Sequence, residues 1–312
     1  MDQVLKPRAL SFGSHIALVS PASSARATAI HRGLRELRRL GFQPDWRRKA
    51  ERPEGYFAGS ERGRSEEILA ALRGPQIRGV FCIRGGYGSA YLVESLRELR
   101  GVRPKILMGY SDITCLQLAL WRTFHWVTFY GPMVAAGFSD GARRPGGYDP
   151  VSLGKALSSH REGWDIPLRG RTLARGSAAG TLLGGCLTLI QDSIGTDWEL
   201  DTRDSILLLE DCAIQPYQLD RMLVHLLQAG KFDGVRGVVF GEFPDSGGGK
   251  GSRVTVMEVC RRLIGSLGIP VVYGAPVGHA RRAMLTIPLG VRARLVARGP
   301  GRLEILEPAV SA

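Results

Sequence analysis

A serine on a strand-to-helix turn is the strongest chemical signal in this sequence. The apolar run 105–108 ends at Gly109, and Ser111 follows just before an amphipathic segment over 113–124. A turn of this kind pushes the serine hydroxyl out of the sheet, beside helix N–H groups that lack an intrahelical acceptor. Such donors can hold a developing oxyanion, so Ser111 is a candidate nucleophile. A serine that only caps the helix is the alternative interpretation.

A serine nucleophile needs a base, which histidine most often supplies. Among the six histidines, His279 lies on the Gly/Pro-containing turn 275–279, directly after an expected strand. Loops at strand ends concentrate catalytic groups, although an ordinary surface histidine would also fit here. An acid should orient the imidazole, and the apolar strand pattern 205–209 runs directly into Glu210 and Asp211. Glu210 is the better candidate and Asp211 the reserve, with plain solvation of a strand end as the alternative.

A glycine-rich segment follows another expected strand. Residues 84–88 read Arg-Gly-Gly-Tyr-Gly and lie between the strand 79–83 and a helix expected over 90–99. They therefore belong to the sheet edge where open α/β folds bind ligands. The spacing fails as a dinucleotide fingerprint, because Tyr87 or Tyr91 stands where glycine is required. Glycines here would instead let backbone N–H groups approach a reacting carbonyl, with a structural tight turn as the alternative.

The order of strand and helix signals predicts an α/β protein with two domains. Residues 1–140 alternate strand and helix patterns, as in a doubly wound parallel sheet. Turn formers are dense over 139–147, and a linker region is predicted at 141–168, before a second domain over 169–312. The expected strands are 15–20, 79–83, 105–108, 126–130, 179–183, 205–209, 237–240, 271–273, 291–297 and 302–306; the expected helices are 27–40, 65–72, 90–99, 113–124, 215–229 and 255–267.

Composition narrows the functional classes. The chain has 312 residues, of which 44% are hydrophobic and 23% charged, as in an ordinary globular protein with a substantial core. Its five cysteines are scattered without C-x-x-C spacing, which predicts reduced thiols and neither disulfides nor zinc ligands. No other metal-ligand spacing appears, so no metal is expected. No apolar run approaches the ~18 residues that span a bilayer, which predicts a cytoplasmic protein without membrane contact.

The net charge of +13 raises the question of nucleic-acid binding. Only six of the 42 basic residues are lysine, and the arginines are dispersed along the chain without interleaved aromatic residues. A compositional bias toward arginine explains this charge as well as a ligand does, so no nucleic-acid partner is expected. The charge would still favour the encounter with a small anionic substrate.

Several short motifs occur in series along nearly the whole chain. They are I-A-L-V-S-P (16–21), G-Y-F-A-G (55–59), R-G-G-Y-G-S (84–89), G-Y-S-D-I-T (109–114), F-Y-G-P-M (129–133), G-G-C-L (184–187), L-L-E-D (208–211), G-E-F (241–243) and G-H (278–279). In content and order they resemble the LD-carboxypeptidase family of serine peptidases, whose best-known members are muramoyl-tetrapeptide carboxypeptidases. The resemblance implies a flavodoxin-like doubly wound parallel-sheet N-terminal domain and a C-terminal swivelling β/α domain.

The resemblance also implies roles for particular residues. Ser111 would be the nucleophile, His279 the general base and acid, and Glu210 the residue that orients the imidazole. The backbone N–H groups of Gly86 and Asp112 would form the oxyanion hole. The active site would lie between the two domains.

Arg84 is our candidate for binding the terminal carboxylate of the substrate. The implied reaction is hydrolysis of an L,D amide bond, with release of the terminal D-Ala from a murein tetrapeptide during peptidoglycan recycling. The resemblance implies no cofactor and a homodimer.

Two alternatives remain open. A microcin-immunity peptidase of the same family would cleave a peptidyl-nucleotide amide. A non-catalytic α/β ligand-binding module would require the three polar side chains to lie far apart.

Overall fold

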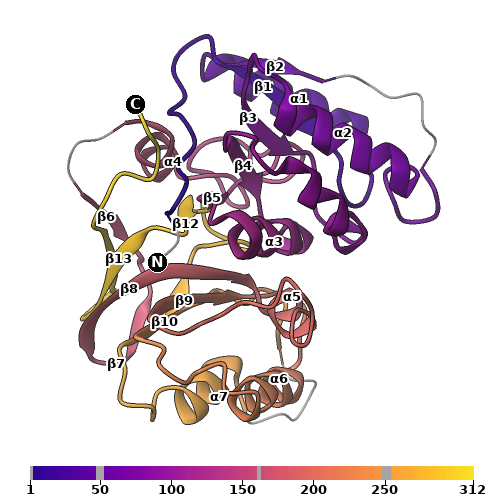
Figure 1. Cartoon of the computed structure of the whole chain (residues 1–312). Coiled ribbons are helices and arrows are strands. Elements are labelled where there is room, and N and C mark those ends of the chain that lie inside the picture. Colours follow the sequence, from indigo (N-terminus) through magenta and orange to yellow (C-terminus); the bar gives the residue numbers. More distant parts are fainter. Residues whose placement is uncertain (1–2, 47–52, 160–162, 248–253) are drawn as a thin grey trace.

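The computed structural model describes residues 3–46, 53–159, 163–247 and 254–312. Two sheets, each with its own helices, form a first body and a second body (Figure 1). The first body holds the six-stranded sheet and the second body holds the eight-stranded sheet. Among the helices within those ranges, none is both long and apolar enough to cross a membrane.

The first sheet is parallel except for one edge strand. Its order is β12-β5-β4-β3-β1-β2, formed by β1 (His15–Val19), β2 (Gln43–Asp45), β3 (Ile77–Cys82), β4 (Ile106–Gly109), β5 (Thr128–Tyr130) and β12 (Ile287–Leu289). The five strands from the N-terminal half are all parallel and run in the order 2-1-3-4-5, which is the flavodoxin-like arrangement. This confirms the predicted fold class for the N-terminal half.

Three α-helices cover this sheet: α1 (Ala27–Arg39), α2 (Glu61–Arg73) and α3 (Thr114–Phe124). Along α1 the buried residues Ile30, Leu34 and Leu37 recur at helical spacing and face the sheet. The helix α2 begins at Ser60, whose side chain accepts a hydrogen bond from the Gly63 N–H at 3.1 Å. These local signals account for the helices that the sequence predicts.

One predicted helix is different in the structure. Residues 90–99 do not form an α-helix; they belong to two short 3₁₀ helices, η1 (Ser89–Leu92) and η2 (Glu94–Leu99). Their buried side chains, Ser89 with Leu92 and Leu96 with Leu99, are three residues apart. A spacing of three places side chains on one face of a 3₁₀ helix, which explains the tighter winding.

The region predicted as a linker contains regular structure. The helix α4 (Pro150–Leu157) starts after Asp149, whose carboxylate accepts the Ser152 N–H at 2.8 Å. The strand β6 (Trp164–Pro167) follows, while residues 160–162 lie outside the described part. The proposed domain boundary itself remains a prediction.

The second sheet has the order β6-β14-β13-β8-β9-β10-β11-β7. Its remaining strands are β7 (Arg171–Ala174), β8 (Gly176–Cys186), β9 (Ser205–Glu210), β10 (Gly237–Gly241), β11 (Val271–Ala275), β13 (Arg292–Ala297) and β14 (Arg302–Ile305), with helices α5 (Leu187–Asp192), α6 (Pro216–Gln228) and α7 (Val256–Leu263). The central strands β8 to β11 are parallel and the outer pairs are antiparallel. The strand β9 is buried at every position, so both of its faces need apolar side chains. This explains why it appears in the sequence as an uninterrupted apolar run.

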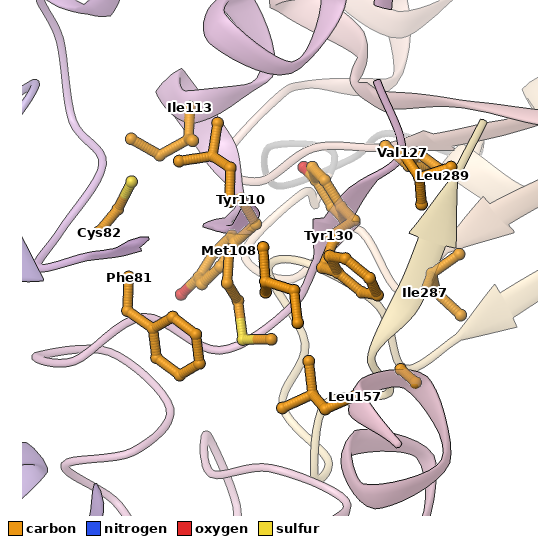
Figure 2. Packing of buried hydrophobic residues seen from close by; sticks show 14 of the residues in the cluster. Phe81, Cys82, Met108, Tyr110, Ile113, Val127, Tyr130, Leu157, Ile287 and Leu289 are labelled. Atoms are coloured by element: carbon orange, nitrogen blue, oxygen red, sulfur yellow. The ribbon is translucent and has the colours of Figure 1, made fainter. Parts of the chain in front are cut away.

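The two bodies are joined through α3 and through β12. The helix α3 lies between the sheets (Figure 1), and its Leu118 belongs to the core of the second body. The side chain of Thr114, at the start of α3, accepts a hydrogen bond from the N–H of Cys186, at the end of β8, at 3.1 Å. Ile287 of β12 pairs with Tyr130 of β5, and Figure 2 shows this strand packed beside the buried residues of the first body. The segments after β4, β9 and β11 are thereby brought to one interface.

Candidate active site

Ser111 occupies a strained turn directly after β4. Its φ is +64°, a left-handed conformation that costs a non-glycine residue about 1–2 kcal/mol. Ser111 begins the 3₁₀ helix η3 (Ser111–Ile113), which leads into α3. The N-cap residues of these helices are Tyr110 and Ile113, and no side chain caps either helix. Ser111 therefore does not serve as a helix cap, and strained residues of this kind cluster at functional sites.

The glycine-rich segment 84–88 packs closely against Ser111. A Cβ atom on Gly85 would lie 2.9 Å from Cβ of Ser111, so only glycine allows this approach. Gly86 has a φ of +109°, and a side chain there would collide with Ser23. The guanidinium of Arg84 donates to the carbonyl oxygen of Ser24 at 2.9 Å. Residues 84 and 86, which the sequence singled out, thus lie on the segment that contacts the candidate nucleophile.

Asp112 ties the same segment to the serine turn. Its side chain is buried, and its Oδ2 accepts the N–H of Ser89 at 2.8 Å. Burial raises the pKa of this carboxyl, while its hydrogen bonds with Ser89 and Gly88 act in the opposite direction. The side chain of Asp112 therefore fixes the loop, and its backbone N–H is the group with a predicted catalytic role.

Glu210 and His279 are in direct contact. Nδ1 of His279 lies 3.0 Å from Oε2 of Glu210, and the backbone N–H of His279 donates to the same oxygen at 2.8 Å. Glu210 is fully buried at the end of β9, whereas the His279 side chain retains 21% exposure. Because Nδ1 faces the carboxylate, Nε2 is the ring nitrogen left for another partner.

Two glycines make room for the carboxylate. A Cβ on Gly278, whose φ is +59°, would lie 2.2 Å from Cδ of Glu210. A Cβ on Gly241, the last residue of β10, would lie 2.5 Å from Cβ of Glu210. The glycines of the G-E-F and G-H motifs are thus explained by the close approach of backbone to Glu210.

The pKa of His279 reflects this environment. Burial acts to lower it, but the Glu210 charge and hydrogen bonds with Cys212 and Glu210 outweigh burial, so the pKa is raised above its ordinary value. The carboxylate therefore stabilises the imidazolium form, which is the form that a histidine base passes through when it accepts a proton.

Asp211, the reserve candidate, has a different task. Its Oδ2 accepts both the backbone N–H of Thr188 at 2.9 Å and the hydroxyl of Thr188 at 2.7 Å. These contacts cap the start of α5. The structure therefore favours Glu210 over Asp211 as the partner of His279.

Tyr130 is a site residue that sequence reasoning missed. Its hydroxyl donates to Oε1 of Glu210 at 2.5 Å and accepts the backbone N–H of Ser111 at 3.2 Å. Tyr130 therefore bridges the serine turn of the first body and the acid of the second body. The F-Y-G-P-M motif contained this residue, but no spacing rule in the sequence shows where its hydroxyl points.

Tyr110, the residue before Ser111, contacts the ring of His279. In the part of the chain that is described, no hydrogen bond joins Oγ of Ser111 to the His279 ring, although the ring of Tyr110 meets it edge-on at 5.1 Å. Catalytic hydrogen bonds are often long in enzymes without substrate and tighten in the complex. No group of three or more His, Cys, Asp or Glu side chains in the described ranges has the arrangement of a metal site.

Comparison with known proteins identifies the family of this chain. The family model described as the LD-carboxypeptidase N-terminal domain matches residues 16–131, and the model of the LD-carboxypeptidase C-terminal domain matches residues 179–295. The first range contains Ser111, and the second contains Glu210 and His279. The chain belongs to the LD-carboxypeptidase family. It is therefore a serine-type carboxypeptidase, as predicted.

Two curated relatives span most of this LD-carboxypeptidase. The "Probable murein peptide carboxypeptidase" of Bacillus subtilis is 30% identical over 293 residues, which are 93% of this chain and 91% of that protein. The "Murein tetrapeptide carboxypeptidase" of Pseudomonas aeruginosa is 29% identical over 298 residues, which are 89% of this chain and 91% of that protein.

Two solved structures share its architecture. A muramoyltetrapeptide carboxypeptidase from Oxalobacter formigenes covers 94% of this chain and 99% of its own, with a TM-score of 0.78 and 26% identity. The microcin C7 self-immunity protein MccF, in complex with glutamyl sulfamoyl guanosine, covers 98% of this chain and 100% of its own, with a TM-score of 0.85 and 23% identity. The two-domain fold class predicted from the sequence is confirmed.

Proposed function

We propose that this LD-carboxypeptidase hydrolyses the L,D amide bond of a murein tetrapeptide and releases the terminal D-Ala in peptidoglycan recycling. The names of the curated relatives from Bacillus subtilis and Pseudomonas aeruginosa, which refer to murein peptides, support this substrate class. The observation that carries the proposal is the contact between His279 and the buried carboxylate of Glu210, which Tyr130 links to the strained Ser111 turn.

The proposed reaction begins with proton transfer from Ser111. Nε2 of His279 takes the proton from Oγ as Oγ attacks the carbonyl carbon of the scissile amide. Glu210 holds the imidazole through Nδ1 and stabilises the positive charge that develops on it. The backbone N–H groups of Gly86 and Asp112 are proposed to receive the oxyanion of the tetrahedral intermediate.

The second half of the reaction reverses this proton path. The protonated His279 gives its proton to the leaving amine of D-Ala, and an acyl-enzyme on Ser111 remains. Water, deprotonated by His279, attacks the ester, and Oγ of Ser111 recovers its proton as the shortened peptide departs. The proposed reaction consumes one water molecule for each amide bond that is hydrolysed, and it needs no cofactor.

Arg84 is proposed to bind the terminal carboxylate of the peptide. Its exposed guanidinium lies on the segment that contacts Ser111, and its bond to the Ser24 carbonyl uses one of five N–H donors. The net charge of +13 suits a peptide that bears several carboxylates. We further propose that the enzyme works in the cytoplasm as a homodimer, which sedimentation of the purified protein would test.

The direct test compares the wild type with Ser111→Ala on a murein tetrapeptide, with released D-Ala as the readout. We expect the variant to lose at least ~10³-fold in kcat, as when the nucleophile of a serine triad is removed. Ser266→Ala removes a surface hydroxyl far along the chain and should retain full activity. Equal D-Ala release by wild type and Ser111→Ala would contradict the proposal.

The same preparations distinguish the two peptidase classes within the family. A peptidyl-nucleotide amide would be cleaved faster than the tetrapeptide if the chain were a microcin-immunity enzyme. We expect the opposite order, because the curated relatives named above are murein peptidases. The likeness to MccF, at 23% identity, supports the fold and does not favour either substrate.

A further inference from the structure

A cavity lies at the amino ends of β3 and β4, the end of the first sheet opposite the serine. Its volume is about 640 Å³, and it is lined by residues before and at the start of β3, by residues before β4, by the N-terminal segment and by Ser311. Lys105 is one of the lining residues, and the chain runs from there through β4 to Ser111. At ~3.3 Å per residue these two ends are about 20 Å apart. The cavity is therefore separate from the proposed peptide site, and its size suits a small molecule.

All the charged residues that line this cavity are cationic. Six of its residues are cationic, and no Asp or Glu is among the lining residues: the cations are Lys6, Arg8, Arg73, Arg78, Arg103 and Lys105. Two of them have carboxylate partners from outside the lining. Arg73 pairs with Glu98 at 2.8 Å, and Lys6 pairs with Glu307 at 2.6 Å.

Three arginines are left without such partners. Across the described residues, no ion pair or side-chain hydrogen bond engages Arg8, Arg78 or Arg103. Unpaired cations around one concave space repel each other, and a bound anion removes that repulsion. Planar guanidinium groups match the oxygen pairs of a phosphate group, which favours phosphate as the ligand chemistry.

The side chain of Lys105 is buried and held by two backbone carbonyls. Lys105 is only 9% exposed, and its ammonium donates to the carbonyl oxygens of Gly74 and Ile77, the latter at 2.9 Å. Burial and, to a smaller extent, the nearby charge of Arg78 together lower the pKa of Lys105 to about 8. A bound anion would offset both effects and keep this ammonium charged.

We propose that this cavity is a binding site for a small phosphate-bearing anion, held by Arg8, Arg78 and Arg103 at the end of the first sheet opposite the nucleophile. The site does not depend on the peptide-hydrolysing groups. Its occupancy leaves the chemistry at Ser111 unchanged, because the anion contacts neither body's catalytic loops.

Calorimetric titration with inorganic pyrophosphate at constant ionic strength tests the proposal. The cavity variant is Arg78→Gln with Arg103→Gln, and its matched control is Arg35→Gln with Arg38→Gln, two exposed arginines of α1 outside the cavity. Both variants lose the same charge. We expect saturable one-to-one binding to wild type and control, and a Kd about tenfold or more weaker in the cavity variant. Thermal unfolding of each variant shows that it is folded.

The outcomes distinguish a specific binding site from nonspecific attraction of the anion by positive charge. A wild type that shows no saturable binding, or an equal loss in both variants, would mean that only general positive charge acts. Citrate that binds as tightly as pyrophosphate would overturn the assignment to phosphate. D-Ala release should be equal in all three proteins and insensitive to pyrophosphate; competition between pyrophosphate and the peptide would overturn the separation of the two sites.

Discussion

At the scale of single residues, the site depends on one buried hydroxyl as well as on the three predicted side chains. Tyr130 is itself fully buried, and its hydroxyl contacts the backbone of Ser111 and the carboxylate of Glu210. Hydrogen bonds to a buried charged group contribute about 1.5–3 kcal/mol. Tyr130 is therefore a positioning residue that acts through its two neighbours.

The substitution Tyr130→Phe tests this role. It keeps the ring and removes both hydroxyl contacts, so we expect kcat to fall about tenfold or more with little change in KM. Steady-state kinetics on a murein tetrapeptide measures the split between the two constants. Tyr273→Phe is the matched control and should leave both unchanged. A rise in KM alone for Tyr130→Phe would show that the hydroxyl acts on substrate binding.

The Glu210–His279 pair predicts a pH effect. Burial disfavours the charged imidazole and acts to lower the pKa of His279, but Glu210 outweighs burial and raises this pKa. His279 can act as a base only when its imidazole is neutral. In Glu210→Gln we expect the acidic limb of the kcat/KM profile to move to lower pH, while the maximal rate falls by ~10³-fold or more. An unshifted acidic limb would mean that another group titrates.

The same pair affects stability. Because the pKa of His279 is raised on folding, the pair stabilises the fold at pH values below ~6.5, the unfolded value. That contribution is lost as the pH rises through the folded pKa. Urea unfolding should therefore separate wild type from Glu210→Gln more at pH 6 than at strongly alkaline pH.

At the scale of elements, the segments that end or follow β4, β9 and β11 carry the three residues of the proposed triad, and close backbone approach sets their geometry. Gly278 follows β11 with a positive φ and leaves no space for a side chain beside Glu210. Glycine is required there for two independent reasons, backbone conformation and contact.

Gly278→Ala separates these two reasons. We expect ~100-fold or greater loss of kcat, because the new Cβ displaces Glu210 and with it the imidazole. Gly274→Ala is the matched control, since Gly274 also has a positive φ, of +82°, but has open space around it. Both variants carry the backbone strain, and only Gly278→Ala should lose activity. Equal losses would assign the effect to strain alone.

Elements with strong local signals were predictable from the sequence, and those formed by distant partners were not. The Gly-Tyr-Ser turn after an apolar run marked Ser111, and the acids after 205–209 marked Glu210. The strand β12 was missed because three residues carry no periodicity, and its partner β5 lies far away in sequence. The helix α4 was missed although Asp149 and Pro150 are a helix-start signal, because the surrounding turn formers indicated a linker. The role of Tyr130 depends on tertiary distances that no single-sequence pattern contains.

At the scale of the whole molecule, the proposed triad is divided between two bodies. Ser111 comes from the first body, and Glu210 and His279 come from the second. A hydrogen bond from the N–H of Cys186 to the side chain of Thr114 holds the start of α3, the helix that follows Ser111, against the second sheet. The relative placement of the two bodies therefore determines whether the reacting groups meet.

Thr114→Val tests this contact. The substitution preserves shape and leaves the buried N–H of Cys186 without its acceptor, so we expect the free energy of unfolding to fall by about 1–3 kcal/mol. Urea denaturation measures the change. Thr172→Val, which removes an exposed hydroxyl bond to Gly299, should change it by less than about 0.5 kcal/mol. Indistinguishable midpoints for the two variants would show that the contact does not stabilise the interface.

The edge strand β12 has a consequence for dissecting this protein. Residues 287–289 are translated after both triad residues proposed for the second body, yet they complete the sheet that bears the serine. A fragment ending near residue 140 would expose the free side of β5 to pairing with other copies, the usual route to aggregation. The sheet built by the amino-terminal half is therefore completed only after residues 287–289 have been synthesised.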